Sequence, residues 1–168
     1  GVKVTWNKIE GATNYLVYRA EYNTSTKKWT SWKSFKTIDT TSFVDESVVS
    51  NVKYKYTVRA LNGESRSYYK SSAELLYLAT PTVVAEKIDG AIKVSWTKTE
   101  GATSYIIYRS ELSADGKWSK WTRLGTASEK YTSCKDKTAK ANVTYKYTVR
   151  AVNGKVKSAY VPGAQVTN

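Results

Sequence analysis

Residues 2–19 read VKVTWNKIEGATNYLVYR, and residues 92–109 repeat them as IKVSWTKTEGATSYIIYR. A second block, NVKYKYTVRA at residues 51–60, returns as NVTYKYTVRA at residues 142–151, with nine of ten positions identical. The offset between copies is 90 residues in the first block and 91 in the second. A period of this length is the size of a small domain, so we expect the 168-residue chain to be a tandem pair.

Both blocks alternate apolar and polar residues with the period of a half-buried strand. Residues 2–6 alternate valine or tryptophan with lysine or threonine, and residues 53–60 place tyrosine, valine and alanine on one face. The Asn-Gly pairs at 62–63 and 153–154 are strong hairpin-turn signals. No stretch carries a helical apolar stripe, so the sequence predicts an all-β chain of two β-sandwiches.

The composition argues against catalysis. The sequence contains no histidine, which excludes the Ser-His-Asp triad and histidine-ligated zinc. Its single cysteine, Cys134, can form neither an internal disulfide nor a thiolate cage, and no phosphate-binding or calcium-binding loop is present. The fourteen acidic residues are scattered through strand ends and turns. We therefore expect no enzyme, no catalytic residues, no cofactor and no metal.

The repeated blocks resemble fibronectin type III modules. A tryptophan closes the second strand, Gly-Ala-Thr-x-Tyr-x-Val-Tyr-Arg follows, and Tyr-x-Tyr-x-Val-Arg-Ala-x-Asn-Gly comes late in each copy. The two copies of the pattern together cover nearly the whole chain. The pattern is similar to that of the modules in secreted and surface proteins of Gram-positive bacteria. The resemblance implies two tandem immunoglobulin-like β-sandwiches in an extracellular or cell-wall-associated protein.

The resemblance also implies structural roles for particular residues. Trp6 and Trp96 would be the core tryptophans of strand B, and Tyr54 and Tyr145 the corner tyrosines at the start of strand F. Cys134 aligns with a phenylalanine of the first copy at an inward strand position, so a buried, inert thiol is expected.

The expected modules span residues 1–78 and 79–168. The second has a strand A at residues 81–88, but nothing stands before Gly1, so the first module is expected to lack strand A and expose one edge. What completes that edge, and hence the oligomeric state, stays open. Only residues 78–80 separate the modules, too few for a flexible tether, which favours an elongated rod.

The chain is expected to be a piece of a longer protein. It contains no methionine, so Gly1 is not a native translation start. No signal peptide and no apolar run long enough for a membrane span is found, so membrane insertion is not expected. The first expected partners are therefore the flanking domains of the parent protein.

The chain is strongly basic, with a formal net charge of +13. Residues 1–78 hold 12 basic against 7 acidic side chains (+5), and residues 79–168 hold 15 against 7 (+8). This charge supports contact with polyanions such as teichoic acid or acidic polysaccharide. The lysines are spread over both copies without a block of like charge, so a solvated surface is the simpler interpretation and no specific nucleic-acid binding is expected.

Two tryptophan pairs, Trp29 with Trp32 and Trp118 with Trp121, recur as Lys-Trp-x-x-Trp. A spacing of three in a strand places the two rings on opposite faces, so at most one of each pair packs inward. The other ring either covers a sheet edge or remains exposed to stack on a sugar or anchor a protein.

A second candidate surface follows from strand parity. Tyr18 and Arg59 are expected to point outward from neighbouring strands, and Tyr108 and Arg150 occupy the same positions in the second copy. We interpret each tyrosine–arginine pair as a cation–π contact that stabilises the sheet.

Three functional classes remain, of which an enzyme is kept only as a remote third. The first is a non-catalytic spacer or presentation rod, or an adhesion-type interaction module, of a larger extracellular bacterial protein. The alternative is a carbohydrate-binding accessory module that uses the exposed tryptophans. The expected ligands are a cell-wall or host polysaccharide or a protein; fold resemblance alone cannot choose among them.

Overall fold

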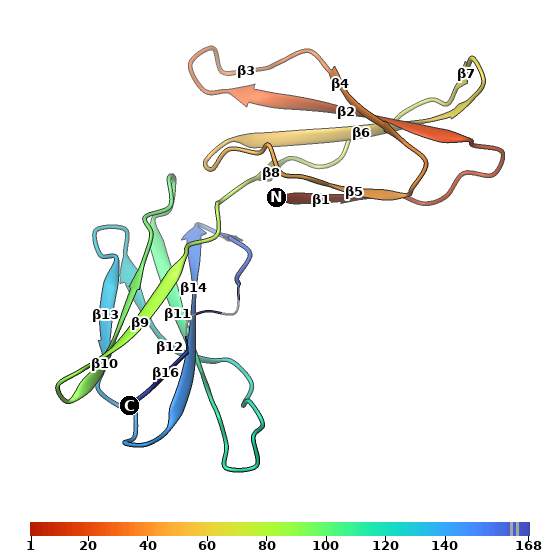
Figure 1. Ribbon diagram of the computed structural model, residues 1–168. Coiled ribbons are helices and arrows are strands. Elements are labelled where there is room, and N and C mark those ends of the chain that lie inside the picture. The colour runs from red at the N-terminus through yellow and green to blue at the C-terminus, as the bar shows by residue number, and fades with distance from the viewer. Residues whose placement is uncertain (162, 164) are drawn as a thin grey trace. The chain divides into compact units, whose positions relative to one another are not determined.

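The computed structural model describes residues 1–161, 163 and 165–168. Every regular element among them is a β-strand, as Figure 1 shows. The chain divides into two compact units, Gly1–Tyr77 (unit 1) and Leu78–Asn168 (unit 2), one residue from the division at 78/79 that the sequence suggested. That each unit folds independently stays a prediction.

Unit 1 has two antiparallel sheets. The small sheet pairs β1 (Val2–Thr5) with β5 (Ser42–Asp45). The large sheet is built on β2 (Asn14–Asn23) and β6 (Lys53–Asn62), which pair from Asn14 opposite Leu61 to Glu21 opposite Tyr54. Its outer strands are β3 (Lys28–Trp29), β4 (Lys33–Ile38), β7 (Ser65–Arg66) and β8 (Leu75–Leu76).

Unit 2 repeats this plan with one more strand in its small sheet. That sheet has the order β13 (Ser133–Asp136), β10 (Ala91–Trp96), β9 (Val83–Ile88). The large sheet is built on β11 (Ser104–Glu111) and β14 (Thr144–Asn153). Its outer strands are β12 (Thr122–Ser128), β15 (Val156–Lys157) and β16 (Gln165–Thr167).

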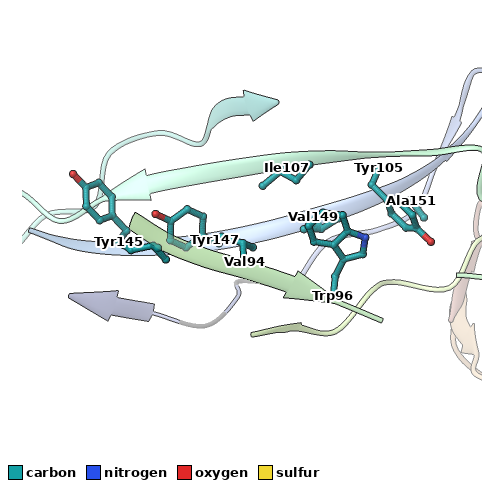
Figure 2. Close-up of a cluster of buried hydrophobic side chains, with 9 residues drawn as sticks. Val94, Trp96, Tyr105, Ile107, Tyr145, Tyr147, Val149 and Ala151 are labelled. Carbon is teal, nitrogen blue, oxygen red and sulfur yellow. The ribbon is translucent and has the colours of Figure 1, made fainter. Parts of the chain in front are cut away.

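The core of unit 2 lies between its two sheets. Val94 and Trp96 of β10 point toward the large sheet, where they meet Tyr147 and Val149 of β14 (Figure 2). Trp96 is only 5% exposed, so its predicted place in the core is confirmed. Alternation along β10 and β14 aims these side chains toward the core and turns the residues between them to the opposite face.

The open edge expected in unit 1 is seen at β1. Among the described residues β1 pairs only with β5, whereas β10, its counterpart, pairs with both β13 and β9. Val94 is fully buried, but the matching Val4 and the core tryptophan Trp6 are only partly buried. One side of the unit 1 core is therefore less covered than its counterpart in unit 2 among the described residues.

The predicted corner tyrosines are confirmed. The hydroxyl of Tyr54 accepts a hydrogen bond from the backbone N–H of Val49 at 2.8 Å, and that of Tyr145 accepts one from Lys140 at 2.9 Å. Each bond ties the start of β6 or β14 to the connection that precedes it, which is the geometry of a tyrosine corner.

Candidate functional site

The outer face of the large sheet carries the same hollow in both units. We call it the aromatic–arginine pocket. In unit 1 it encloses about 190 Å³ and is lined by Tyr18, Trp32, Thr57, Arg59 and Tyr69. In unit 2 it encloses about 140 Å³ and is lined by Tyr108, Trp121, Thr148, Arg150 and Tyr160. The two linings match residue for residue.

The paired central strands place three of the five lining residues. Tyr18 of β2 lies directly opposite Thr57 of β6, and Arg59 follows two positions along the same face. Since successive side chains alternate across a strand, all three point away from the core that holds Tyr54 and Tyr56. The strand parity predicted for Tyr18 and Arg59 therefore brings them to one outer face, and Tyr108 and Arg150 follow the same rule.

The fourth residue, Tyr69, comes from the strap, by which we mean residues 67–70 in unit 1 and 158–161 in unit 2. Ser67 holds the strap to β6: its N–H donates to the Ala60 carbonyl at 2.9 Å, and its Oγ accepts from the Ala60 N–H at 3.0 Å. Thr57 Oγ1 donates to the Lys70 carbonyl at 3.1 Å. The outward residues of β6 thus position the strap across the sheet.

Unit 2 fixes its strap by the same bonds. Ser158 exchanges two hydrogen bonds with Ala151, at 2.8 and 3.0 Å, and Thr148 Oγ1 donates to the Val161 carbonyl at 2.8 Å. Tyr160 is therefore held where Tyr69 is held in unit 1. These two tyrosines were absent from the sequence-predicted site. Their separation of 91 residues, equal to that of Arg59 and Arg150, was the available signal.

The tryptophan of the pocket forms its second aromatic wall. Trp32 meets Tyr69 edge to face, with ring centroids 6.5 Å apart and planes at 70°. Trp121 and Tyr160 repeat this contact at 6.3 Å and 73°. Both tryptophans are partly buried, so one part of each ring packs and another remains open to solvent.

The expectation that the two tryptophans of a pair lie on opposite faces is wrong. Trp29 packs under Lys55, whose Nζ lies 4.2 Å from the ring centroid, and Lys55 shares the outer face with Arg59. Trp32 also lies on that face. The period-two rule fails because β3 ends at Trp29, and the chain is not in a strand again until β4.

Trp29 and Trp118 lie outside the pockets. Trp118 repeats the lysine contact of Trp29, with Lys146 Nζ 3.9 Å from its ring centroid. Of the eight candidate residues, the structure therefore gathers three in each pocket and leaves Trp29 and Trp118 as partners of lysine side chains.

The predicted cation–π contact exists but with a different ring. The guanidinium of Arg59 lies over Tyr69, with Cζ 5.9 Å from the centroid, and that of Arg150 lies over Tyr160 at 5.8 Å. Nε of Arg59 donates to the Ser67 carbonyl at 2.8 Å, and Nε of Arg150 to Ser158 at 2.7 Å. The strap, which strand parity could not place, supplies the ring and the carbonyl.

A second arginine of each unit, Arg19 or Arg109, binds a buried carboxylate in place of lining the pocket. Arg19 Nη1 donates to the buried carboxylate of Asp45 at 2.8 Å, and Tyr56 and Ser47 donate to the same carboxylate. Burial by itself would raise the pKa of Asp45, but the bonds from Arg19, Ser47 and Tyr56 outweigh it and lower the pKa. Burial and the bond to Asp45 raise the pKa of Tyr56.

Unit 2 repeats this buried cluster with Asp136, Arg109 and Tyr147. Arg109 Nη1 and the Tyr147 hydroxyl each donate to Asp136 at 2.8 Å. Burial opposes ionisation of Asp136, but the bonds from Thr138, Arg109 and Tyr147 lower its pKa. Sequence reasoning missed this cluster in both copies.

Apart from the pockets, reactive chemistry could come from metal-ligating groups or from the single cysteine. No group of three or more histidine, cysteine, aspartate or glutamate side chains among them could hold a metal ion. Cys134 is partly buried against the core, and burial, followed by the nearby Asp136, raises the pKa of its thiol. Within the same residues, no helix is long and apolar enough to cross a membrane. The aromatic–arginine pockets themselves present aromatic rings, an arginine and a threonine hydroxyl.

No protein-family model matches the sequence, and no curated protein matches it. Among solved structures, the chain is similar to a segment of two fibronectin type III domains from chicken tenascin, at 17% identity and a TM-score of 0.50, over 99% of this chain and 91% of that one. The FN1–FN3 domains of chicken CNTN1 align at 20% identity, a TM-score of 0.45, and 98% and 59% coverage. The chicken interferon gamma receptor alpha chain aligns at 11% identity and a TM-score of 0.49, over 98% of this chain and 90% of that one. The likeness to the tenascin segment confirms the predicted fold class: the chain is all-β, with two tandem sandwiches of the fibronectin type III fold.

Proposed function

We propose that this chain is a non-catalytic pair of interaction modules from a larger extracellular bacterial protein, and that each module binds its ligand at the aromatic–arginine pocket. The observation that carries the proposal is the identity of the two pockets. Five residues from four separate parts of each unit line them, and all five are of the same type in both.

Within the strap, the pocket tyrosine is the same in both units although its neighbours are not. Tyr69 corresponds to Tyr160, but its neighbours differ, because Tyr68 corresponds to alanine and Lys70 to valine. Tyr69 is 54% exposed and Tyr160 48% exposed. Half-exposed aromatic rings beside a cation suit a sugar ring or an apolar group of a protein.

A spacer is the second candidate function. The last strand of unit 1 ends at Leu76 and the first strand of unit 2 begins at Val83, so the connection between them is short. Modules joined by a short connection would hold flanking domains of the parent protein apart. In that case the arginine–tyrosine contacts stabilise each sheet and bind nothing.

The proposed ligand is a polysaccharide of the cell wall or of a host, and a protein ligand is the other possibility. An extracellular or cell-wall-associated location fits both. The net charge of +13 adds a diffuse attraction to polyanions, which salt screens over about 8 Å at physiological ionic strength. Ring stacking in a pocket does not depend on salt in this way.

A glycan array at low and high salt tests the proposal. We expect saturable binding that persists in high salt, that the double variant Trp32→Ala/Trp121→Ala loses, and that the matched variant Trp29→Ala/Trp118→Ala keeps, since Trp29 and Trp118 lie outside the pockets. Absence of saturable binding would favour the spacer. Binding that disappears with salt in every variant would leave only polyanion attraction.

A further inference from the structure

We infer that each aromatic–arginine pocket recognises one acidic sugar residue, with the carboxylate at the arginine and the sugar ring against the aromatic side chains. The inference rests on the proposed binding function of the pocket and adds the chemical class of the ligand.

The first argument is the contrast between the two arginines of each unit. Arg19 is bound by the carboxylates of Asp45 and Glu21, at 2.8 and 2.6 Å. Arg59 lies in a pocket with no acidic residue in its described lining, and its hydrogen bond there runs from Nε to a carbonyl. Its charge is therefore balanced by no carboxylate among the described lining residues.

Arg150 repeats this arrangement in unit 2. It donates from Nε to the Ser158 carbonyl, and its pocket lining has no acidic residue among the described residues. Arg109 of the same unit binds Asp136. The bond to the strap uses Nε of the guanidinium and not its Nη groups. The planar guanidinium presents paired N–H donors that match the two oxygens of a carboxylate.

The second argument is the shape of the aromatic walls. Trp32 and Tyr69 meet at 70°, and Trp121 and Tyr160 at 73°, so each pocket has two ring surfaces set nearly at right angles. The arginine lies over the tyrosine of this corner. A ligand seated in the corner meets an aromatic surface and a cation at once. A sugar ring that carries a carboxylate has both complementary features.

The third argument is size. The pockets enclose about 190 and 140 Å³, well below the roughly 300–1,000 Å³ of typical small-molecule sites. Each pocket has room for about one sugar ring, so one residue of a longer chain would occupy it. The positive charge of both halves of the chain, +5 and +8, favours an acidic ligand over a neutral one.

The test is an NMR titration of the whole chain with three probes: methyl glucuronide, methyl glucoside and acetate. The first two differ only in the carboxylate, and acetate supplies the carboxylate without the ring. We expect methyl glucuronide to bind at least ten times more tightly than either of the others, with the largest shifts at pocket residues. The same order is expected in 0.5 M NaCl.

Two double variants make the test specific. Arg59→Gln/Arg150→Gln should weaken glucuronide binding at least tenfold, to the level of the glucoside. Arg66→Gln/Lys157→Gln removes the same charge from exposed, matching positions on β7 and β15 and should leave binding within twofold. Because Arg59 and Arg150 also hold the strap, Tyr69→Ser/Tyr160→Ser serves as a second pocket variant at half-exposed positions.

Each other outcome overturns the inference in a distinguishable way. Equal binding of glucuronide and glucoside, lost with the tryptophans, would keep the binding function and refute the acidic class. Equal binding of acetate and glucuronide would identify a plain carboxylate site, as an acidic peptide would use. Absence of binding by all three probes at pocket residues would refute the acidic-sugar inference, while the glycan array would still decide the proposed binding function.

Discussion

At the scale of single residues, the carboxylates of Asp45 and Asp136 hold together parts of the chain that are far apart in sequence. Asp136 joins Arg109 of β11, Tyr147 of β14 and the turn at Thr138, and its side chain is completely buried. A buried carboxylate is tolerated only when its lone pairs are satisfied. Each donor therefore becomes costly to remove once the carboxylate is in place.

Replacing Asp136 with asparagine is expected to destabilise unit 2 by about 3 kcal/mol at neutral pH, because Arg109 and Tyr147 lose a charged acceptor. The folded pKa of Asp136 lies below its ordinary value of 3.8, so the stability from its ionised form is fully present above that value. It is lost as the pH falls further, through the folded pKa.

Urea unfolding from pH 2.5 to pH 7 measures this effect. The wild-type stability should fall below about pH 4 more steeply than that of Asp136→Asn. Glu86→Gln, which removes an exposed partner of Lys93, is the control and should cost less than about 1 kcal/mol. Parallel pH profiles for wild type and Asp136→Asn would show that the carboxylate contributes nothing in its ionised form.

At the scale of elements, the strand β9 distinguishes the two units. It pairs with β10 over six residues, from Ala91 opposite Ile88 to Trp96 opposite Val83, and places Val83 and Ala85 against the core. Among the described residues β1 has no such neighbour. Nearly identical strand sequences thus yield a closed sandwich edge in unit 2 and an open one in unit 1.

The two core tryptophans should therefore differ in importance. Trp96→Ala should cost about 3–5 kcal/mol by opening a cavity in a closed core. Trp6→Ala should cost clearly less, because Trp6 is partly exposed, and so should Trp121→Ala at the pocket. The urea midpoint of each variant measures the cost. An unchanged midpoint for Trp96→Ala would exclude it from the core.

A strand added beside β1 should stabilise unit 1. We expect an extension before Gly1 that copies residues 81–90 to pair with β1 as β9 pairs with β10, and to bury Val2, Val4 and Trp6. The gain should be about 2 kcal/mol or more, from apolar burial alone. The control extension carries lysine at the places of Val83 and Ala85. Equal stability of both extensions would show that the edge does not accept a strand.

At the scale of the whole molecule, two copies of one fold differ in the completeness of their cores. Among the described residues, the core cluster of unit 2 contains nine buried side chains and that of unit 1 contains three. Since protection of backbone amides depends on how much structure must open, the units should open at different free energies.

Hydrogen exchange followed by mass spectrometry tests this difference and the independence of the units. The amides of β14 should stay protected under mild urea concentrations at which those of β6 have exchanged. Single transitions that coincide for β6 and β14 would instead show that the chain unfolds as one cooperative body.

The sequence by itself determined the all-β fold class, the tandem repeat, the buried place of Trp96 and the corner role of Tyr54 and Tyr145. These features follow from local alternation and from repetition, because side chains alternate across a strand whatever their distant neighbours are. The same alternation was sufficient to bring Tyr18 and Arg59 to one outer face.

Only the tertiary structure decided the composition of the aromatic–arginine pocket and of the buried carboxylate cluster. Tyr69 reaches Arg59 because hydrogen bonds of Ser67 and Thr57 hold the strap across the sheet. Trp32 does not follow the alternation of a strand because β3 ends before it, at Trp29. Asp45 meets Arg19 from a position 26 residues away. Contacts of this kind depend on how separate segments meet in space, and no periodicity along the chain encodes that meeting.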